Sequence, residues 1–496
     1  MKHGKTLNPH LLEINAFAFM SRMREKYGRG LSLGTIPANE WQEVASQGFS
    51  SVWLMGVWER SFESRECALK DERLRKAYDT ALPGWTDEDV KGSPYAVHSY
   101  TVDSFLGSGQ DLLALKSTLN GLGMGLILDF VPNHLAIDHP WTASSPEMFI
   151  EGGPKDLEQD PPLFFRSESG RILAHGRDPY FPAWRDTVQV NPFSPSGRRA
   201  LINELIRIAD CADGVRCDMA MLVLNEVFAK TWGAYLEETP LPEKEFWTEA
   251  ISEVKALHPS FTFMAEAYWD LEYRLQQLGF DYTYDKRLYD LMLHADVREI
   301  RAHLHGDECY QKRCIRFIEN HDERRAVDAF GRDRSCAAAV VMATAPGLHL
   351  FHDGQLEGAE IHLPIQLARR GEERADPSIR DFYDRLLAFA AGGPFTTGSW
   401  RHLDVRPAWS EDISWTNLLA WIRHGEGTTK LVCVNYSDSP SQGRLRIVPE
   451  LIQAGPLAFR DRLTDEVYIR TTDEILSEGL YVELGPWKSH LFDLLS

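Results

Sequence analysis

The chain has 496 residues, of which 43% are hydrophobic and 25% are charged, a balance that excludes a disordered, collagen-like or coiled-coil protein. At roughly 100–200 residues per domain, this length allows two to four domains with sizeable cores. The formal net charge of −20 repels phosphate backbones and anionic membrane surfaces. We therefore expect no nucleic acid and no membrane as partner.

Cysteine usage and the start of the chain indicate a reducing compartment. The seven cysteines are scattered and form no CxxC pair, which argues against a disulfide framework or a structural zinc site. The opening segment MKHGKTLNPHLLEIN lacks the uninterrupted apolar stretch of a signal peptide, and no run of about 18 apolar residues follows. These features predict a cytoplasmic protein, and they leave its oligomeric state open.

Eight short apolar runs follow one another along the chain, with helical stretches between them. They are LLEINAFAF near residue 11, SSVWLMGVW from 50, GLILDFV from 125, GVRCDMA from 214, FTFMAEAYW from 261, DYTYDKRLY from 281, CIRFIENHD from 314 and GLHLFHDGQ from 347. Many stay apolar up to a polar end, which is typical of parallel strands buried on both faces. The alternation predicts a (β/α)8 TIM barrel, with a doubly wound sheet as the alternative.

Two further segments depart from this alternation. The stretch 133–189 between the third and fourth runs is rich in Pro, Gly, Asp and aromatics, and it is long enough for an inserted subdomain or a lid. From 393 to 496, short alternating segments separated by turn residues predict a C-terminal antiparallel β-sandwich domain. The barrel would then comprise 1–132 and 190–392. The charged segment 65–79 predicts an exposed helix near the rim of a site.

Polar residues end four of the predicted strands, which is where a barrel of this kind forms its active site. They are Asp129, Asn133 and His134 in DFVPNH, Arg216 and Asp218 in GVRCDMA, Glu266 in FMAEAYW, and His321 and Asp322 in FIENHDE. One such carboxylate alone would suggest a helix cap, but four at one mouth suggest glycosidic chemistry. Cleaving an acetal needs a proton donor for the leaving oxygen and a negative group facing the oxocarbenium-like carbon.

The two chemical roles require carboxyl groups with different pKa values. Glu266 lies in an apolar and aromatic run, so desolvation should raise its pKa and favour the neutral acid. Asp218 follows Arg216 by two residues on the same predicted strand, which places both side chains on one face. The arginine should therefore keep Asp218 ionised and nucleophilic.

The segments DFVPNH, GVRCDMA, MAEAYW and FIENHD resemble, in order, the four signature segments of the α-amylase family of glycoside hydrolases. The stretches GSPYAVHSYTVDSFLG at 92–107, DTVQVN at 186–191 and PGLHLFHDGQLEG at 346–358 resemble further segments of that family. The match spans nearly the whole chain. The resemblance implies a barrel, a domain inserted after the third strand, a C-terminal β-sandwich and a carbohydrate substrate.

Carried over position by position, the resemblance implies roles for the matched residues. Asp218 would be the nucleophile, Glu266 the general acid/base, and Asp322 the third carboxylate, which stabilises the transition state. Arg216 would hold Asp218 ionised, with Asp129 as its structural partner. The remaining contacts to the sugar that the resemblance implies are hydrogen bonds from His134 and His321 and stacking by Tyr95. Apart from the resemblance, Trp269 lies three residues after Glu266 and could line the acceptor side, with a place in the core as the alternative.

The chain departs from the family pattern just after the predicted nucleophile. Starch-cleaving members often carry Lys and His three and four residues later, whereas this chain has Met221 and Leu222. This difference weakens the expectation of long-chain starch binding and of the usual calcium site. Asn133 could still join Asp156 or Asp160 in binding an ion, but hard cations need about six oxygen ligands. We therefore expect no metal and no cofactor.

Basic residues follow two of the predicted strands and leave a second function open. Arg324 and Arg325 follow the seventh strand, and Lys286 and Arg287 follow the sixth. They could bind an anionic acceptor or leaving group such as phosphate, and structural ion pairs are the alternative. The segment 263–287 is also loosely similar to family transferases that use a phosphorylated maltose donor.

Three functions thus remain on the sequence alone. The first is a retaining α-glycoside hydrolase that acts on oligosaccharides or small α-glucosides through a covalent β-glycosyl-Asp intermediate. The second is a transglycosylase, because hydrolysis and transfer share every catalytic residue. The third is a non-catalytic carbohydrate-binding homologue.

Overall fold

The computed structural model describes residues 9–236, 240–451 and 455–495. Eight parallel strands close a barrel in chain order, and the last pairs with the first. They are β1 (His10–Asn15), β2 (Ser51–Met55), β5 (Gly125–Phe130), β10 (Gly214–Cys217), β11 (Thr262–Ala265), β12 (Tyr282–Tyr284), β13 (Cys314–Arg316) and β14 (Leu348–His352). Each predicted run supplies one strand, so the prediction of a (β/α)8 barrel is confirmed and the doubly wound alternative is wrong.

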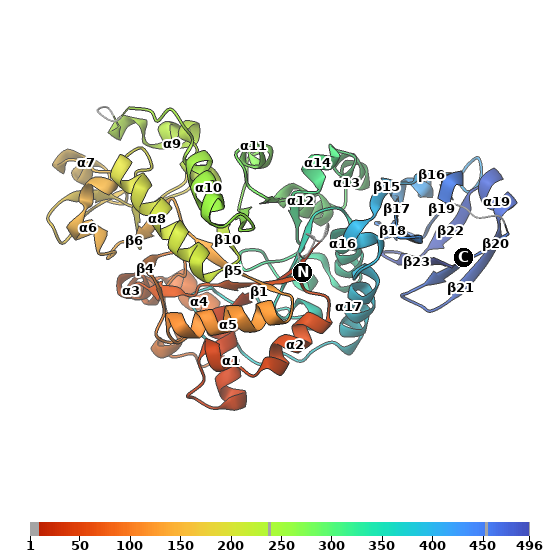
Figure 1. The fold of residues 1–496 in the computed structure, drawn as a ribbon, viewed down its shortest axis with the longest axis horizontal. Helices are drawn as coiled ribbons and strands as arrows, with labels where there is room; N and C mark the ends of the chain where they lie inside the picture. The colour runs from red at the N-terminus through yellow and green to blue at the C-terminus, as the bar shows by residue number, and fades with distance from the viewer. Residues whose placement is uncertain (1–8, 237–239, 452–454, 496) are drawn as a thin grey trace.

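Helices surround the barrel and connect its strands (Figure 1). They are α1 (Ala16–Tyr27), α2 (Ala38–Ser46), α3 (Phe62–Lys70), α4 (Glu72–Ala81), α5 (Gly109–Gly121), α8 (Pro195–Cys211), α9 (Asn225–Trp232), α10 (Phe246–Leu257), α11 (Glu272–Gln277), α12 (Lys286–His294), α13 (Val297–Leu304), α14 (Glu308–Gln311), α15 (Ala326–Phe330), α16 (Arg332–Thr344), α17 (Pro377–Ala390) and α18 (Pro394–Thr397). Strands β3 (Trp58–Arg60) and β4 (Val97–Val102) form a separate antiparallel pair after β2. None of the described helices combines the length and apolarity that crossing a bilayer requires.

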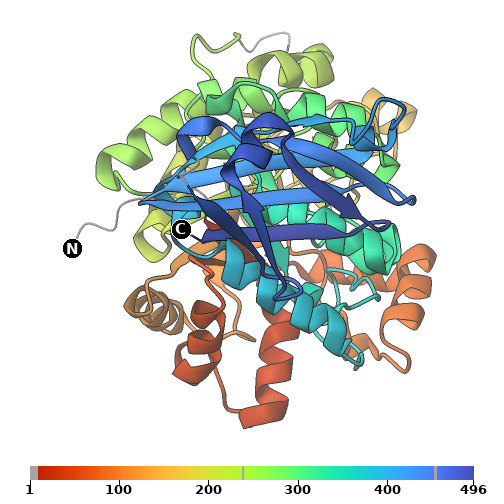
Figure 2. The same ribbon diagram turned by 90° about the vertical axis from the view of Figure 1, so that its right-hand side faces the viewer.

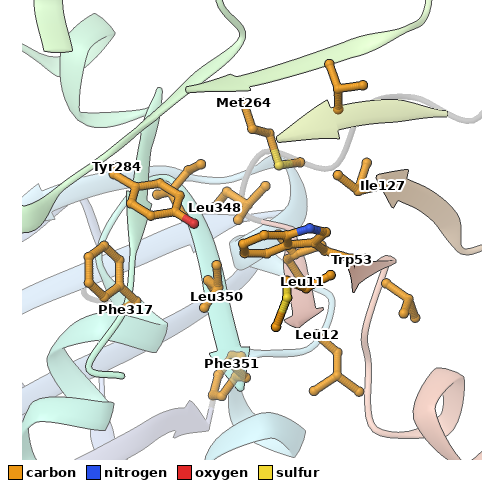
Figure 3. Packing of buried hydrophobic residues seen from close by; sticks show 14 of the residues in the cluster. Leu11, Leu12, Trp53, Ile127, Met264, Tyr284, Phe317, Leu348, Leu350 and Phe351 are labelled. Carbon is orange, nitrogen blue, oxygen red and sulfur yellow. The ribbon is translucent and has the colours of Figure 1, made fainter. Parts of the chain in front are cut away.

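Apolar side chains from many strands fill the barrel region, which is why the strands read as apolar runs in the sequence. Figure 3 shows Trp53, Met264 and Leu350 among the buried side chains packed there. The close approach of β10 to its neighbours depends on Gly214. A Cβ atom at this position would lie 2.6 Å from the carbonyl oxygen of Thr262, so a larger residue would push the strands apart.

The charged segment 65–79 forms two helices rather than the single exposed helix that we predicted. The helices α3 and α4 are separated at Asp71, whose carboxylate accepts hydrogen bonds from the backbone N–H groups of Arg73 and Leu74. An aspartate that caps a new helix N-terminus in this way interrupts the preceding helix. Charge alternation along the segment does not reveal that break.

The inserted stretch contains short elements that pack beside the barrel at one end of the molecule (Figure 1). They are β6 (His134–Ala136), α6 (Trp141–Ser144), α7 (Pro154–Gln159), β7 (Phe164–Arg166), β8 (Ile172–Ala174) and β9 (Thr187–Gln189). Strand β6 pairs with β9 and β7 pairs with β8, both antiparallel. A small core that includes Phe164, Phe228 and Trp232 joins this stretch to α9.

The C-terminal region consists of antiparallel sheets, as predicted. A six-stranded sheet has the order β15-β17-β18-β23-β20-β21, and a three-stranded sheet has the order β16-β19-β22. The elements are β15 (Ser399–His402), β16 (Asp404–Arg406), β17 (Leu418–Gly425), β18 (Thr428–Asn435), β19 (Ser441–Arg446), β20 (Pro456–Asp461), β21 (Val467–Thr471), α19 (Thr472–Ser477), β22 (Leu480–Leu484) and β23 (Ser489–Leu495). One apolar cluster draws residues from both sheets, as in a sandwich.

The sheets lie beside α16 and α17, at the side of the barrel away from the insert (Figures 1 and 2). The Tyr436 hydroxyl donates to the carbonyl of Met292 (2.8 Å), and Lys430 Nζ donates to the carbonyl of Phe389 (2.6 Å). These bonds tie the sheets to the barrel. The domain boundaries at 132/133, 189/190 and 392/393 stay predictions, and residues 1–8 of the opening segment lie outside the described residues.

We predict that barrel packing dominates the stability of the protein. Leu350 in β14 is fully buried, so Leu350→Ala should lower the free energy of unfolding by about 3–5 kcal/mol through lost burial and a residual cavity. Leu113 in α5 is 41% exposed, and the matched control Leu113→Ala should change it by less than about 0.5 kcal/mol. Urea denaturation checks both variants, and equal losses would contradict the assignment of Leu350 to the core.

Candidate active site

The C-terminal ends of the barrel strands open into a cleft of about 1110 Å³. Asp218 follows β10, Glu266 follows β11 and Asp322 lies six residues after the end of β13, and all three line this cleft. Tyr95 and His134 line it as well. The structure therefore brings together five of the predicted site residues, which the chain supplies from widely separated positions.

A buried guanidinium connects two of these carboxyl groups. Arg216 is 1% exposed, and its Nη1 donates to Asp218 Oδ1 (2.5 Å) while its Nη2 lies 2.9 Å from Glu266 Oε2. The rings of Tyr95 and Tyr284 lie 5.1 and 5.6 Å from the guanidinium carbon, which is the range of a cation–π contact. One cation thus faces both carboxyl groups and is held between aromatic rings.

The three carboxyl groups have different pKa values for identifiable reasons. Burial, with the charges of Asp218 and Asp322, raises the pKa of Glu266 to about 7, although Arg216 opposes the rise. Burial also raises the pKa of Asp218, again against Arg216. Burial favours a higher pKa for Asp322 too, but His321 lowers it to about 2. Near neutral pH, Glu266 is therefore the group that can carry a proton.

The carboxyl group of Glu266 is held at both oxygens by neighbours that the sequence analysis missed. The backbone N–H of Met219 donates to Oε2 (2.6 Å), and the Tyr268 hydroxyl donates to Oε1 (2.8 Å). Met219 has φ = 42°, a left-handed conformation that is unfavourable for a side chain of this size. The i, i+2 spacing of Glu266 and Tyr268 is the signal that could have indicated their contact.

His321 lies beneath Tyr95 and Asp322 rather than among the residues that line the cleft. Its Nε2 is 2.7 Å from the Tyr95 hydroxyl and 3.1 Å from Asp322 Oδ2. Its Nδ1 is 2.5 Å from Oε1 of Glu13, a fully buried residue of β1. The sequence analysis gave Glu13 no role, because a single acidic residue within LLEINAFAF carries no motif.

Two other predicted site residues, Asp129 and Trp269, do not line the cleft. Asp129 accepts from the Trp53 indole (3.0 Å) and the Gly56 N–H (2.7 Å), not from Arg216. Trp269 is 36% exposed and its ring contacts that of Tyr180, outside the cleft lining.

Three of the four basic residues that follow the sixth and seventh strands form ion pairs. Arg324 is exposed and pairs with Asp328 (2.7 Å), and it does not line the cleft. Arg325 is buried against Glu319 (3.0 Å). Lys286 lies 3.2 Å from Glu323 and also contacts Asp290. These contacts favour the structural interpretation of these three residues over anion binding.

Elements outside the barrel form the walls of the cleft. The insert contributes Asp178 and residues 181–187, and the helices α3 and α4 contribute side chains that include Lys70 and Arg73. The charged segment therefore shapes the rim, as we predicted. Three cations that the sequence analysis did not select face the cleft here, namely Lys70, Arg73 and Arg185.

Within the described ranges, no group of three or more His, Cys, Asp or Glu side chains is placed to hold a metal ion. Asn133 hydrogen bonds with the Gln189 side chain (3.0 Å). Met221 and Leu222 are both buried. Of the two aspartates considered with Asn133 for an ion, Asp156 accepts a hydrogen bond from the Gly153 N–H (2.6 Å) and Asp160 is exposed.

Comparison with known proteins relates this arrangement to a family. No protein-family model matches the chain. The chain is 24% identical over 368 residues to the α-amylase MalA of Haloarcula japonica, which covers 71% of this chain and 50% of the relative. It is 23% identical over 484 residues to an α-1,4-glucan:maltose-1-phosphate maltosyltransferase of Bifidobacterium longum, which covers 90% of this chain and 56% of the relative. The chain spans about half the length of the curated relatives it matches.

A solved structure shares the fold over the whole chain. The noncanonic maltogenic α-amylase AmyB from Thermotoga neapolitana superposes with a TM-score of 0.68 at 17% identity, and the match covers 99% of both chains. A likeness at this identity establishes the barrel and its C-terminal β region. The sequence relatives agree with the resemblance to the α-amylase family of glycoside hydrolases, and the structural match confirms the fold that this resemblance implies.

We predict that Arg216 stabilises the fold in a pH-dependent way. Arg216→Met leaves Asp218 and Glu266 buried without their cation, so their pKa values should rise and ionising them should destabilise the folded state. The free energy of unfolding should fall by about 3–5 kcal/mol, and the loss should grow from pH 5 to pH 8.

Thermal and urea melts at both pH values check this prediction. The matched control is Arg199→Met on α8, where the side chain is 49% exposed and pairs with Glu249 and Glu253 at the surface. Arg199→Met should lower the free energy of unfolding by less than about 1 kcal/mol at either pH. A loss for Arg216→Met that does not change with pH would contradict the pairing that we describe.

Proposed function

We infer that this member of the α-amylase family is a retaining α-glycoside hydrolase that cleaves α-glucosidic bonds of oligosaccharides or small α-glucosides. The observation that carries this inference is the pair formed by Asp218 and Glu266, which contact one buried guanidinium in one cleft but differ in pKa. Contact with the same guanidinium keeps the two carboxyl groups near each other, which supports a retaining mechanism because inverting enzymes need a wider separation.

The reaction would proceed by double displacement. Asp218 attacks the anomeric carbon while Glu266 donates its proton to the departing oxygen, which breaks the glycosidic bond and forms a β-glycosyl ester on Asp218. Glu266, now ionised, takes a proton from water, whose oxygen attacks the same carbon and releases Asp218 with the α configuration restored. Because Met219 N–H and Arg216 face Oε2, the proton would reside on Oε1, beside the Tyr268 hydroxyl.

Asp322 and the aromatic groups would bind the sugar at the cleavage point. Asp322 keeps 43% of its side chain exposed and faces the cleft as a carboxylate, which suits a hydrogen bond to ring hydroxyls. Tyr95 and His134 would supply a stacking ring and a neutral imidazole. Burial lowers the pKa of His134 to about 4, so it would face the substrate uncharged.

Transfer to a sugar acceptor is the second candidate. The maltosyltransferase of Bifidobacterium longum aligns with 90% of this chain, and Lys70, Arg73 and Arg185 on the cleft wall would suit a phosphorylated sugar. A binding protein without activity has less support, because all three carboxylates reach the cleft. We propose the cytoplasm as the location, since all seven cysteines are free.

We predict that turnover depends on the Asp218 carboxylate. Asp218→Asn should lower kcat on an activated aryl α-glucoside by at least about 10³-fold, because an amide cannot form the ester. Asp404→Asn, an exposed position of β16, is the matched control and should keep kcat within about twofold. Equal turnover by Asp218→Asn and the native protein would refute the assignment of the nucleophile.

The same assay, followed by NMR on a panel of α-glucosides, distinguishes the candidates. An α-configured first product supports retention, and a β-configured one would overturn it. Released glucose indicates hydrolysis, longer products indicate transglycosylation, and a glycosyl phosphate formed only in added phosphate indicates transfer to an anion. Binding without any turnover would support the non-catalytic alternative.

We predict a descending limb near pH 7 in the dependence of kcat/KM on pH. Glu266 must be protonated to act as the acid and its pKa is raised to about 7, so kcat/KM should fall about tenfold per pH unit above that value. The ascending limb reports ionisation of Asp218, and because burial raises the pKa of Asp218, this limb should lie above the ordinary range of an aspartate. For the variant Glu266→Gln, the descending limb of kcat/KM should disappear when the substrate is an aryl glucoside whose leaving group needs no proton. If the descending limb remains near pH 7 in Glu266→Gln, it reports the ionisation of a group other than Glu266.

A further inference from the structure

The mechanism above uses the carboxylates of the cleft but not Glu13, a carboxylate beneath it. Glu13 lies on β1, is 0% exposed and contributes nothing to the cleft lining. Its Oε1 is 2.5 Å from His321 Nδ1, while its Oε2 has no hydrogen-bond partner among the described residues. A buried carboxylate with one open oxygen is costly, so its retention calls for a specific partner.

The contacts around His321 define where its protons lie. Nδ1 faces Glu13, which accepts a hydrogen bond when ionised, and Nε2 faces Asp322 Oδ2 at 3.1 Å. A bare nitrogen lone pair at that distance from a carboxylate would be repulsive, so Nε2 carries a proton. With an ionised Glu13, Nδ1 carries one too, and the ring is an imidazolium between two carboxylates.

We propose that Glu13 is a positioning residue that holds His321 as an imidazolium, so that His321 fixes Asp322 and Tyr95 against the bound sugar. The proposal rests on the proposed function, because it assigns the two residues that His321 orients to sugar binding. A doubly protonated ring offers its Nε2–H to the Tyr95 oxygen (2.7 Å) and to Asp322. The Tyr95 hydroxyl proton is then free to point into the cleft rather than at the ring.

The charges around the ring agree with this proton arrangement. Burial favours a lower pKa for His321, but Asp322 and Glu13 raise it well above its ordinary value. Burial favours a higher pKa for Glu13, yet His321 and His352 lower it. On the remaining sides, Asp129 adds a further negative charge, and the imidazole of His362 bonds to the carbonyl of His321 (2.8 Å).

One alternative satisfies the same distances. Glu13 would carry the proton and donate it to Nδ1 of a neutral His321, while Nε2 still donates to Asp322. Two observations disfavour it, because the charge of Asp322 stabilises a cationic ring and Glu13 faces a second imidazole, that of His352. The experiment must therefore report the protonation of the ring itself.

The first measurement is NMR of the full-length protein labelled with ¹⁵N-histidine, with the His321 signal assigned by its loss in His321→Gln. At pH 7 we expect both ring nitrogens of His321 to be protonated in the native protein and one to be unprotonated in Glu13→Gln. A neutral ring in the native protein, or a cationic ring in Glu13→Gln, would overturn the proposal. This measurement needs no turnover, so it separates failure of the proposal from failure of the proposed function.

The second measurement is the pH profile of kcat/KM on an aryl α-glucoside. In Glu13→Gln, His321 should lose its proton at a lower pH than Glu266 does. The descending limb of kcat/KM should therefore move down by at least about one pH unit, and kcat/KM at pH 7 should fall about tenfold or more, with partial recovery at pH 5. Glu319→Gln is the matched control, because Glu319 is 1% exposed and forms ion pairs with Arg325 and His352 rather than with His321. It should keep the native limb even if it lowers stability. If the descending limb of kcat/KM lies at the same pH in Glu13→Gln and Glu319→Gln as in the native protein, the proposal is overturned.

A double-mutant cycle shows whether Glu13 acts through His321. In the His321→Gln background, adding Glu13→Gln should change kcat/KM by less than about twofold, because the group it acts on is gone. An independent further loss would overturn the proposal and assign Glu13 a merely structural role. If Glu13→Gln fails to fold, Glu13→Asp keeps the charge and should retain the cationic ring in the NMR spectrum; a neutral ring there would count against the proposal.

Discussion

One guanidinium, that of Arg216, carries the interaction on which the cleft depends. Removing an arginine and two carboxyl groups from water is unfavourable unless they face one another closely. Here the 2.5 Å bond to Asp218, the 2.9 Å contact with Glu266 and the flanking aromatic rings supply that compensation. A cation shared between two acids also sets a limit, because one positive charge cannot fully stabilise two negative ones. Burial and the charges of Asp218 and Asp322 then raise the pKa of Glu266, so Glu266 is the group that retains its proton.

The second ion pair extends this division of charge to the other side of the cleft. Asp322 faces His321 rather than Arg216, so its pKa falls while that of Glu266 rises. Arg216 and His321 therefore leave Asp322 ionised and Glu266 protonated. Both cations are almost fully buried, and neither lines the cleft. Near the three carboxylates, the cleft thus presents carboxyl oxygens and aromatic rings, while Arg216 and His321, the two groups that set the protonation states, are buried.

The strand order and the converging carboxylates follow from sequence because both reflect simple constraints. Parallel strands buried on two faces read as apolar runs, and a polar residue that ends such a run lies at the mouth of the barrel. Residues outside this pattern were harder to place. Glu13 interrupts an apolar run from within, and its partner lies 308 residues away. Arg324 lies two residues after Asp322 in the sequence, but its side chain pairs with Asp328 at the surface. Adjacency along a loop does not determine side-chain direction.

The proposed function would place chemistry and substrate selection on different parts of this fold. The strand ends would supply the groups that break the bond, whereas the insert and the helices α3 and α4 line the walls of the cleft beyond them. Met221 and Leu222, where starch-cleaving members often carry polar residues, are buried and pack into the core. Under the proposed function, contacts to sugar units beyond the cleaved bond would therefore come from those walls. Because loops and short helices change without disturbing the strands, the same carboxylates can serve different substrates while the walls alone vary.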